Sequence, residues 1–175
     1  EKPSIIPNND LNLCQGETTT FVVSGSGTWV SSNPTVASIT NTGIVTAIVP
    51  GYARFVFTNQ LTGCSSDSSD YVQVLPSPSI FLNGPSSICE GSNTQLAPTI
   101  GGVWNALDPL IATINNTGLA DGLSQGLARF TFTQTSTGCT SSNALSITIM
   151  PLPIVTIIGE DEICIGETSS LSPAS

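Results

Sequence analysis

The stretch Gly51-Tyr-Ala-Arg-Phe-Val-Phe-Thr58 decides the fold of this chain because it occurs twice. The second copy, Gly126-Leu-Ala-Arg-Phe-Thr-Phe-Thr133, begins 75 residues later, and Thr-Gly-Cys follows both copies at the same distance. Aligning residues 1–75 with residues 76–150 without a gap gives 25 identical pairs. Self-similarity at a fixed period is typical of a tandem array, so the fold of one repeat decides the fold of the chain.

The boundaries of the repeats coincide with prolines, in Leu75-Pro-Ser-Pro78 and again in Met150-Pro-Leu-Pro153. We therefore predict one domain at residues 1–76 and a second at 77–151. Residues 152–175 repeat only the beginning of the pattern, which indicates a truncated third repeat cut from a longer array. Two prolines separated by one residue favour an extended linker, so we expect the domains to form a stiff, extended rod.

Each repeat is predicted to consist of short strands without helix. Val, Ile, Thr and Phe alternate with small polar residues, and Gly, Pro, Asn and Ser interrupt them at short intervals. The strands predicted for the first repeat are Ser4–Ile6, Thr18–Ser24, Thr28–Ser31, Val36–Ile39, Ile44–Val49, Ala53–Thr58 and Tyr71–Leu75. Seven short strands around a central tryptophan are typical of an immunoglobulin-like β-sandwich, so the predicted fold class is all-β with tandem sandwiches.

The sixth predicted strand identifies the core. Side chains alternate between the two faces of a strand, which directs Phe55 and Phe57 inward against Trp29. The second repeat keeps the same aromatic residues at the matching positions. The predicted core residues are therefore Trp29, Phe55, Phe57, Trp104, Phe130 and Phe132.

Arg54 and Arg129 lie on the outward face of this same strand in the two repeats. One interpretation is an arginine that binds a ligand. The other is an arginine whose aliphatic stem covers apolar sheet surface while its guanidinium pairs with a nearby carboxylate. We favour the second interpretation.

The composition argues against several classes of function. The chain of 175 residues carries 12 acidic and 3 basic side chains and a net charge of −9. Nucleic acids and anionic membranes attract basic patches, so neither is an expected partner. No apolar run approaches the roughly 20 residues of a membrane span, so no membrane insertion is expected. Histidine, the commonest general base and metal ligand, is absent.

Acidic residues gather at Glu160-Asp-Glu162 with Glu167, and less densely at Asp67 with Asp70. Calcium prefers carboxylate and carbonyl oxygens, so a calcium site is the functional interpretation, and solvated loop charge is the alternative. Neither cluster recurs in the other repeats, and the spacing of an EF-hand is absent. We expect no metal site, no cofactor, no catalytic residue and no enzymatic activity.

Five cysteines without histidine or a Cys-x-x-Cys pair predict disulfides and an oxidising compartment. Each full repeat has two, Cys14 with Cys64 and Cys89 with Cys139. Cys164 is the first cysteine of the incomplete third repeat, and its expected partner lies beyond this sequence. Economy favours pairing within each repeat, which is the pairing we expect.

Topology supports a second pairing. In an immunoglobulin-like sandwich the turn at Cys14 would lie at the C-terminal end of its domain, and the hairpin at Cys64 at the N-terminal end. These ends are about 30 Å apart by strand rise, whereas a disulfide requires Cα atoms within about 7 Å of each other. The alternative is a bond from Cys14 across the junction to Cys139, and both pairings stay open at this point.

The pattern Cys-x-Gly…Trp…Ala-x-Ile…Thr-Gly…Gly-x-Ala-Arg-Phe-x-Phe-Thr…Thr-Gly-Cys resembles the immunoglobulin-like tandem repeats of very large Bacteroidota cell-surface proteins. It is most similar to the repeats of the giant gliding-motility adhesin exported by the type IX secretion system. The resemblance covers both full repeats and the start of the third. It implies a secreted filament on the bacterial cell surface that serves cell adhesion and gliding motility.

The partners that this resemblance implies are neighbouring repeats of the same chain and a surface polysaccharide or substratum. It also implies motility and secretion machinery that is reached through other regions. The alternative function is a spacer or carbohydrate-binding module of a secreted polysaccharide-degrading enzyme. An exposed platform of two or more aromatic rings would favour that alternative. Both tryptophans are predicted to be buried, and Tyr52 and Tyr71 have no counterparts in the second repeat, which disfavours it.

Overall fold

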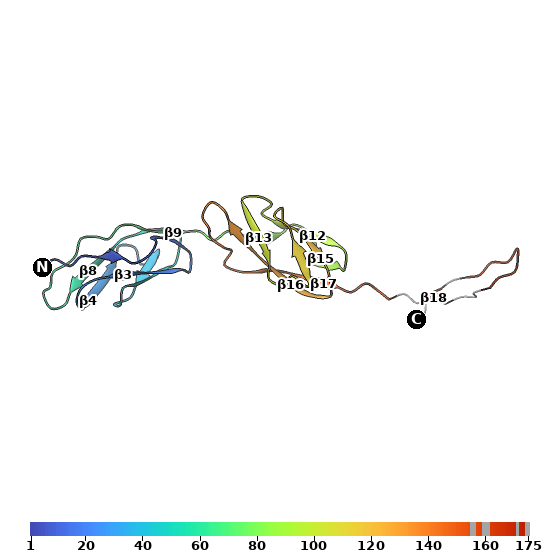
Figure 1. Ribbon diagram of the computed structural model, residues 1–175, viewed down its shortest axis with the longest axis horizontal. Coiled ribbons are helices and arrows are strands. Elements are labelled where there is room, and N and C mark those ends of the chain that lie inside the picture. The colour runs from blue at the N-terminus through green and yellow to red at the C-terminus, as the bar shows by residue number, and fades with distance from the viewer. Residues whose placement is uncertain (155–156, 159–161, 171, 174–175) are drawn as a thin grey trace.

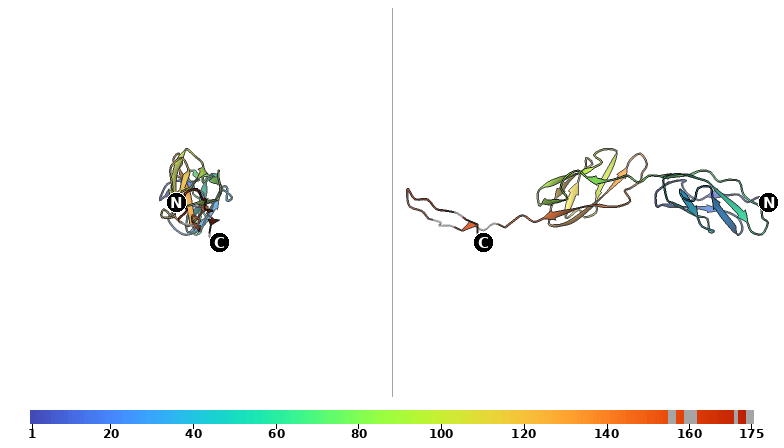
Figure 2. Two further views of the ribbon diagram at one scale, coloured as in Figure 1. Left: turned by 90° about the vertical axis from the view of Figure 1, so that its right-hand side faces the viewer. Right: turned by 180° about the vertical axis from the view of Figure 1, so that it is seen from behind.

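The computed structural model describes residues 1–154, 157–158, 162–170 and 172–173 of the chain. Every regular element among these residues is a β-strand. Two sandwiches follow one another along the long axis of the molecule, and a thin ribbon lies beyond the second (Figure 1). Seen along that axis, the two sandwiches overlap (Figure 2). The predicted all-β class with tandem immunoglobulin-like sandwiches is confirmed.

The first sandwich contains nine short strands. They are β1 Ile6–Pro7, β2 Asn12–Cys14, β3 Thr18–Val22, β4 Gly27–Ser31, β5 Ala37–Ile39, β6 Ile44–Ala47, β7 Gly51–Ala53, β8 Phe55–Asn59 and β9 Val72–Leu75. One layer is an antiparallel sheet in the order β1-β3-β6-β5. The other layer holds β2-β9-β7, in which β2 and β9 run parallel, and the antiparallel pair β4-β8.

The second sandwich repeats this arrangement with a continuous second sheet. Its strands are β10 Phe81–Leu82, β11 Ser87–Cys89, β12 Asn93–Ala97, β13 Gly102–Ala106, β14 Ala112–Ile114, β15 Leu119–Gly122, β16 Gly126–Gln134 and β17 Leu145–Met150. The sheets have the orders β10-β12-β15-β14 and β11-β17-β16-β13. Beyond them, β18 (Ile157–Ile158) pairs antiparallel with β19 (Ser172–Pro173).

Each sandwich has a hydrophobic core of its own. In the first, the ring of Trp29 lies 5.1 Å from that of Phe57 and 5.9 Å from that of Phe21. In the second, the ring of Trp104 lies 5.2 Å from that of Phe132. All six aromatic residues singled out from the sequence are buried, namely Trp29, Phe55, Phe57, Trp104, Phe130 and Phe132. Because neither core includes residues of the other, each sandwich can fold around its own aromatic residues.

The strand predicted at Ser4–Ile6 differs from the observed structure. Residues 6–14 form two strands in different layers, because β1 pairs with β3 and β2 pairs parallel with β9. The segment Pro7-Asn-Asn-Asp10 carries the chain from one layer to the other. Proline has no amide hydrogen and is confined to sheet edges, which explains why the first strand ends there.

The strand predicted at Ala53–Thr58 is interrupted at Arg54 in the first repeat but is continuous as β16 in the second. In β16, Phe130 pairs with Leu145 of the neighbouring strand. In the first repeat, the amide of Phe55 instead donates to the hydroxyl of Ser69 at 3.0 Å. Serine hydroxyls offer the backbone such an alternative to the strand ladder, and the second repeat has alanine at the matching position.

Candidate functional site

The junction between the two sandwiches begins with the turn that carries Cys14. Cys14 ends β2 and pairs with Leu75, the last residue of β9 before the proline linker. The amide of Gly16 donates to the carbonyl of Ala47 at 2.9 Å. The backbone of Gly16 has a φ of 92°, a conformation that favours glycine. These contacts hold Cys14 at the C-terminal end of the first sandwich.

The opposite side of the junction is the hairpin that carries Cys139 in the second sandwich. The amide of Gln134 donates to the carbonyl of Cys139 at 2.9 Å, and the amide of Gly138 donates to the carbonyl of Gln134 at 2.8 Å. The amide of Cys139 donates to the hydroxyl of Thr137 at 3.2 Å. Cys139 is 0% exposed, so the hairpin presents this side chain to the first sandwich and not to solvent.

Cys14 and Cys139 form a disulfide across the junction, with their Cα atoms 5.5 Å apart. The expected pairing within each repeat is therefore wrong for both residues, and the structure has the alternative pairing. The reason is that the two cysteines of one repeat lie at opposite ends of the sandwich. Cys14 adjoins the linker, whereas Asp67, just after Cys64, contacts Lys2 at 2.6 Å beside the N-terminus. We call the Cys14–Cys139 bond the junction disulfide.

The three remaining cysteines are Cys64, Cys89 and Cys164, and all are exposed free thiols. The disulfides expected for Cys64 and Cys89 within their own repeats are thus absent from the described part of the chain. Cys89 adjoins the end of β17 at Met150, as Cys14 adjoins Leu75. Each sandwich thus carries one cysteine near its N-terminal end and one near its C-terminal end.

A shallow hollow lies beside the junction disulfide. Gln15 of the first sandwich and residues 77–80 and 141–143 of the second line it. The amide of Gln15 donates to the carbonyl of Leu75 at 3.1 Å, which ties the turn to the start of the linker. The two sandwiches thus meet through the linker, the disulfide and the residues around this hollow.

The outward arginine of the second repeat pairs with a carboxylate. Nε and Nη2 of Arg129 donate to the two carboxylate oxygens of Asp108 at 2.9 and 3.0 Å. This hydrogen bonding, together with the charge of the guanidinium, holds the pKa of Asp108 below its usual value. The same hydrogen bonding raises the pKa of Arg129. The carboxylate partner expected from the sequence is present in this repeat.

The outward arginine of the first repeat has an aromatic partner. Arg54 lies over the ring of Tyr71, with its guanidinium carbon 3.8 Å from the ring centroid. The second repeat has serine at the position of Tyr71, and the first has Asn33 at the position of Asp108. The expected carboxylate partner of Arg54 is therefore replaced by a cation–π contact.

Tyr52 extends this arrangement on the surface of the first repeat. Its ring centroid lies 5.9 Å from that of Tyr71, and the two rings are inclined by 78°. Both tyrosines are more than half exposed, at 57% and 55%. The sequence indicated that these tyrosines are specific to the first repeat, but it did not predict that they meet.

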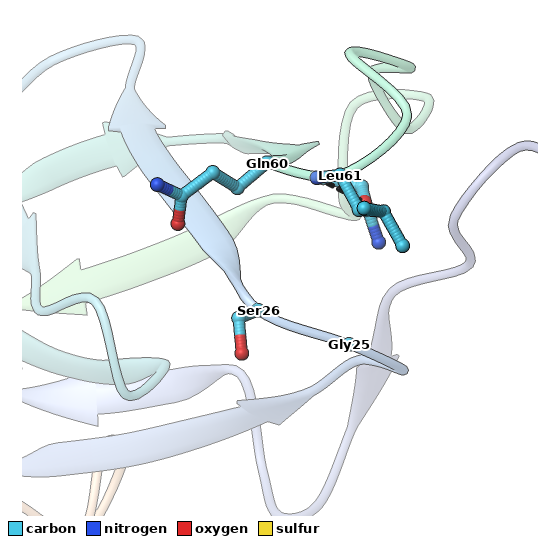
Figure 3. Close-up of a pocket in the computed structure, with 5 residues that line it drawn as sticks. Gly25, Ser26, Gln60 and Leu61 are labelled. Carbon is cyan, nitrogen blue, oxygen red and sulfur yellow. Dashed lines mark hydrogen bonds between the residues drawn. The ribbon is translucent and has the colours of Figure 1, made fainter.

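A second hollow is lined by Gly25, Ser26, Asn59, Gln60 and Leu61. The amide of Gln60 donates to the carbonyl of Ser26 at 2.9 Å, which closes one side of it. The side chains of Gln60 and Leu61 point in different directions (Figure 3). Because no reactive or charged groups converge there, the hollow has the character of a loop surface and not of an active site.

The acidic residues considered as calcium ligands form no such site among those that the structure describes. Residues 160 and 161 lie outside the described residues, and Asp67 forms an exposed ion pair with Lys2. Among the residues that the structure describes, no three His, Cys, Asp or Glu side chains cluster as metal ligands would. The described elements also include no helix with the length and apolarity needed to cross a membrane.

The fold and the junction define a class of protein, namely an array of immunoglobulin-like β-sandwiches with a covalent link between consecutive members. Within this array, residues 1–63 match the sequence model of the bacterial Ig-like domain, group 2. A curated relative is Ice-binding protein 1 of Shewanella frigidimarina (strain NCIMB 400), 28% identical over 116 residues. The alignment covers 59% of this chain but 13% of the relative, so the chain spans a small part of that protein.

Two solved structures were found to be similar to this chain. Invasin, described as a bacterial integrin-binding protein, has a TM-score of 0.50 at 12% identity, over 85% of this chain and 38% of invasin. A 282-residue C-terminal piece of intimin, solved with the intimin-binding domain of its translocated receptor, has a TM-score of 0.49 at 12% identity. That alignment covers 89% of this chain and 65% of the intimin chain. At such low identity, the likeness to invasin shows the fold alone.

Proposed function

We propose that this chain is a structural and adhesive segment of a long filament on the outer surface of a bacterial cell. The filament serves surface attachment and gliding motility, and this segment catalyses no reaction. The observation that carries the proposal is the junction disulfide between Cys14 and Cys139, which joins consecutive sandwiches covalently. A chain of domains linked in this way transmits force and holds a distant adhesive region away from the cell.

The two connections at the junction explain why such a filament would be stiff. The proline linker joins the end of β9 to the second sandwich, and the disulfide joins the Cys14 turn to the hairpin after β16. A single connection would permit the domains to swing about it. Two connections that attach at different residues restrict that rotation, so the junction bends less freely than a single linker would.

The chemistry of the chain supports an extracellular location at the bacterial surface. Disulfides persist in oxidising environments outside the cytosol. The match to the bacterial Ig-like domain agrees with a bacterial surface protein. The proposed partners are neighbouring repeats and a surface polysaccharide or substratum, with motility and secretion machinery reached through other parts of the polypeptide.

Live-cell fluorescence with an antibody raised against residues 1–150 tests this function. We expect labelled spots on intact cells that move as the cells glide, and no label on cells from which the gene has been deleted. Static surface label would support a filament and argue against a role in motility. Label in the medium alone would favour a secreted spacer module, and label that requires cell lysis would exclude a surface protein.

A second candidate function, saccharide binding, is favoured by the exposed pair Tyr52 and Tyr71. Exposed aromatic rings stack against sugar rings, but these two are nearly perpendicular and Arg54 covers one of them. A glycan array would compare the chain with the variant Tyr52→Leu/Tyr71→Ser, which has the residues of the second repeat. Binding that this variant loses would support a carbohydrate-binding module, and equal signals from both proteins would exclude these tyrosines as the binding site.

A further inference from the structure

The junction disulfide uses one cysteine of each sandwich and leaves the matching cysteine of each unbonded. Cys64 in the first repeat matches Cys139, and Cys89 in the second matches Cys14, each at a spacing of 75 residues. Both unbonded residues are exposed thiols. If the backbone around each of these two thiols matches that around its bonded counterpart, each thiol marks one side of a junction whose other side is not bonded to it.

The hairpin at Cys64 has the hydrogen bonds of the hairpin at Cys139. The amide of Asn59 donates to the carbonyl of Cys64 at 3.0 Å, and the amide of Gly63 donates to the carbonyl of Asn59 at 2.9 Å. The matching bonds in the second repeat are 2.9 and 2.8 Å long. The two hairpins differ in the solvent exposure of their cysteines, because Cys139 is fully buried whereas Cys64 is exposed. The Cys64 hairpin therefore has the same backbone hydrogen bonds as the Cys139 hairpin, although it carries no disulfide.

The turn at Cys89 likewise has the form of the turn at Cys14. Cys89 pairs with Met150, and the amide of Glu90 donates to the carbonyl of Met150 at 2.9 Å. The amide of Ser92 donates to the carbonyl of Cys89 at 3.0 Å, compared with 2.9 Å for the matching bond at Cys14. The backbone that presents the thiol is thus already in place in the second repeat.

The surface around Cys64 adds a separate observation. Residues 77–80 and 141–143 line the hollow at the junction, and Gln15 of the preceding sandwich lies against them. The first repeat also forms a hollow, lined by residues 2–5, which match residues 77–80, and by residues 67–70, which include the counterparts of residues 142 and 143. The residues that line this hollow all belong to the first sandwich.

We infer that Cys64 and Cys89 are the two unbonded halves of this same junction and that each bonds another repeat of this kind. Cys64 takes the Cys-x-Gly turn of one such repeat, and Cys89 takes the Thr-Gly-Cys hairpin of another. The contact is head to tail, since the two surfaces differ and lie at opposite ends, so it extends as an open chain. The inference concerns how repeats join and does not depend on any adhesive ligand.

The bond forms by thiol–disulfide exchange with a small disulfide such as oxidised glutathione. The Cys64 thiolate attacks one glutathione sulfur, forms a mixed disulfide and releases one glutathione thiolate. The thiolate of the partner's cysteine then attacks the Cys64 sulfur and releases the second glutathione thiolate. In total two protein thiols are oxidised to a disulfide, and one glutathione disulfide is reduced to two thiols.

Two variants with a single free thiol test the inference in the full chain. The variant Cys89→Ser/Cys164→Ser keeps Cys64, and the variant Cys64→Ser/Cys164→Ser keeps Cys89, while both retain the junction disulfide. Each is incubated alone and in an equal mixture in a glutathione redox buffer, with one variant isotopically labelled. Because the two surfaces are complementary, we expect the mixed dimer to exceed each homodimer by about tenfold. Peptide mapping should show a Cys64–Cys89 bond.

A matched control moves the thiol within the same hairpin. The variant Leu61→Cys in the background Cys64→Ser/Cys89→Ser/Cys164→Ser presents an exposed thiol close to the original one, at a residue that is 93% exposed. It should form no excess of mixed dimer with the variant that keeps Cys89. Homodimers as abundant as the mixed dimer, an equal yield from the Leu61→Cys control, or a mixture that stays monomeric would each overturn the inference. Adhesion is tested separately by the labelling of intact cells.

Discussion

At the scale of single residues, the two core tryptophans differ in their hydrogen bonds. Nε1 of Trp104 donates to the carbonyl of Pro98 at 2.9 Å. Nε1 of Trp29 is buried without a partner, and Val23 occupies the position of Pro98. An unpaired buried donor costs about 1–3 kcal/mol of stability. The first sandwich therefore carries a destabilising feature that the second does not.

Replacing these tryptophans by phenylalanine should have unequal effects. Trp104→Phe removes a hydrogen bond and leaves the carbonyl of Pro98 unpaired, whereas Trp29→Phe removes the unpaired donor. We expect Trp29→Phe to lower the stability of its sandwich by about 1 kcal/mol less than Trp104→Phe lowers that of the other. Hydrogen exchange followed by mass spectrometry would measure the stability of each sandwich separately, from the protection of its own peptides. Equal losses would show that the Trp29 N–H carries no such penalty.

Phe55 allows a test of whether the cores are separate. Its side chain is fully buried, 5.5 Å from the ring of Phe21. Phe55→Ala should lower the unfolding free energy of the first sandwich by about 3–5 kcal/mol, because it deletes a ring from a packed core. Peptides of the second sandwich should keep their protection, and Phe130→Ala should give the reverse pattern. Loss of protection in both sandwiches would argue against independent cores.

At the scale of elements, the arginines at the matching positions 54 and 129 have different kinds of partner in the two repeats. The carboxylate Asp108 has a pKa lowered chiefly by its hydrogen bonds to Arg129. A lowered folded-state pKa means that the pair contributes stability above the unfolded pKa of about 3.9. That contribution is lost as the pH falls from there through the folded pKa.

The variant Asp108→Asn should remove this pH dependence from the second sandwich. Carboxyl chemical shifts in an NMR titration should place the pKa of Asp108 below the usual value for an aspartate. Acid unfolding of the second sandwich should become less dependent on pH in the variant. The first sandwich has asparagine at this position and provides the internal comparison. A titration of Asp108 at the usual aspartate value would contradict the ion pair.

The elements also show which features were predictable from the sequence. Alternation along the strand predicted at Ala53–Thr58 is a local property, so it was sufficient to direct Phe55 inward and Arg54 outward. The break at Arg54 depends on the hydroxyl of Ser69, which reaches the Phe55 amide from a distant part of the chain. The cation–π contact of Arg54 similarly depends on Tyr71 across the sheet. Such partners are set by tertiary packing, which strand periodicity does not encode.

At the scale of the whole molecule, the pairing of cysteines was the feature that one repeat alone could not decide. The topological argument placed Cys14 and Cys64 at opposite ends of a sandwich, but economy favoured bonding them within the repeat. The observed partner of Cys14 belongs to the next domain, 125 residues away. The junction is therefore a property of the array, because the site is incomplete in either sandwich by itself.

Removing the junction disulfide should loosen the molecule without unfolding it. The two cores share no residues, so Cys14→Ser/Cys139→Ser should keep the circular dichroism of folded β-sandwiches. The proline linker would then be the one remaining covalent connection between the sandwiches. Small-angle scattering should show a broader distribution of maximum dimensions, because the domains can bend relative to each other at residues 75–78. The variant Cys64→Ser, which removes an exposed free thiol, should scatter like the parent chain. Identical scattering from the double variant would show that the linker alone holds the two sandwiches in line.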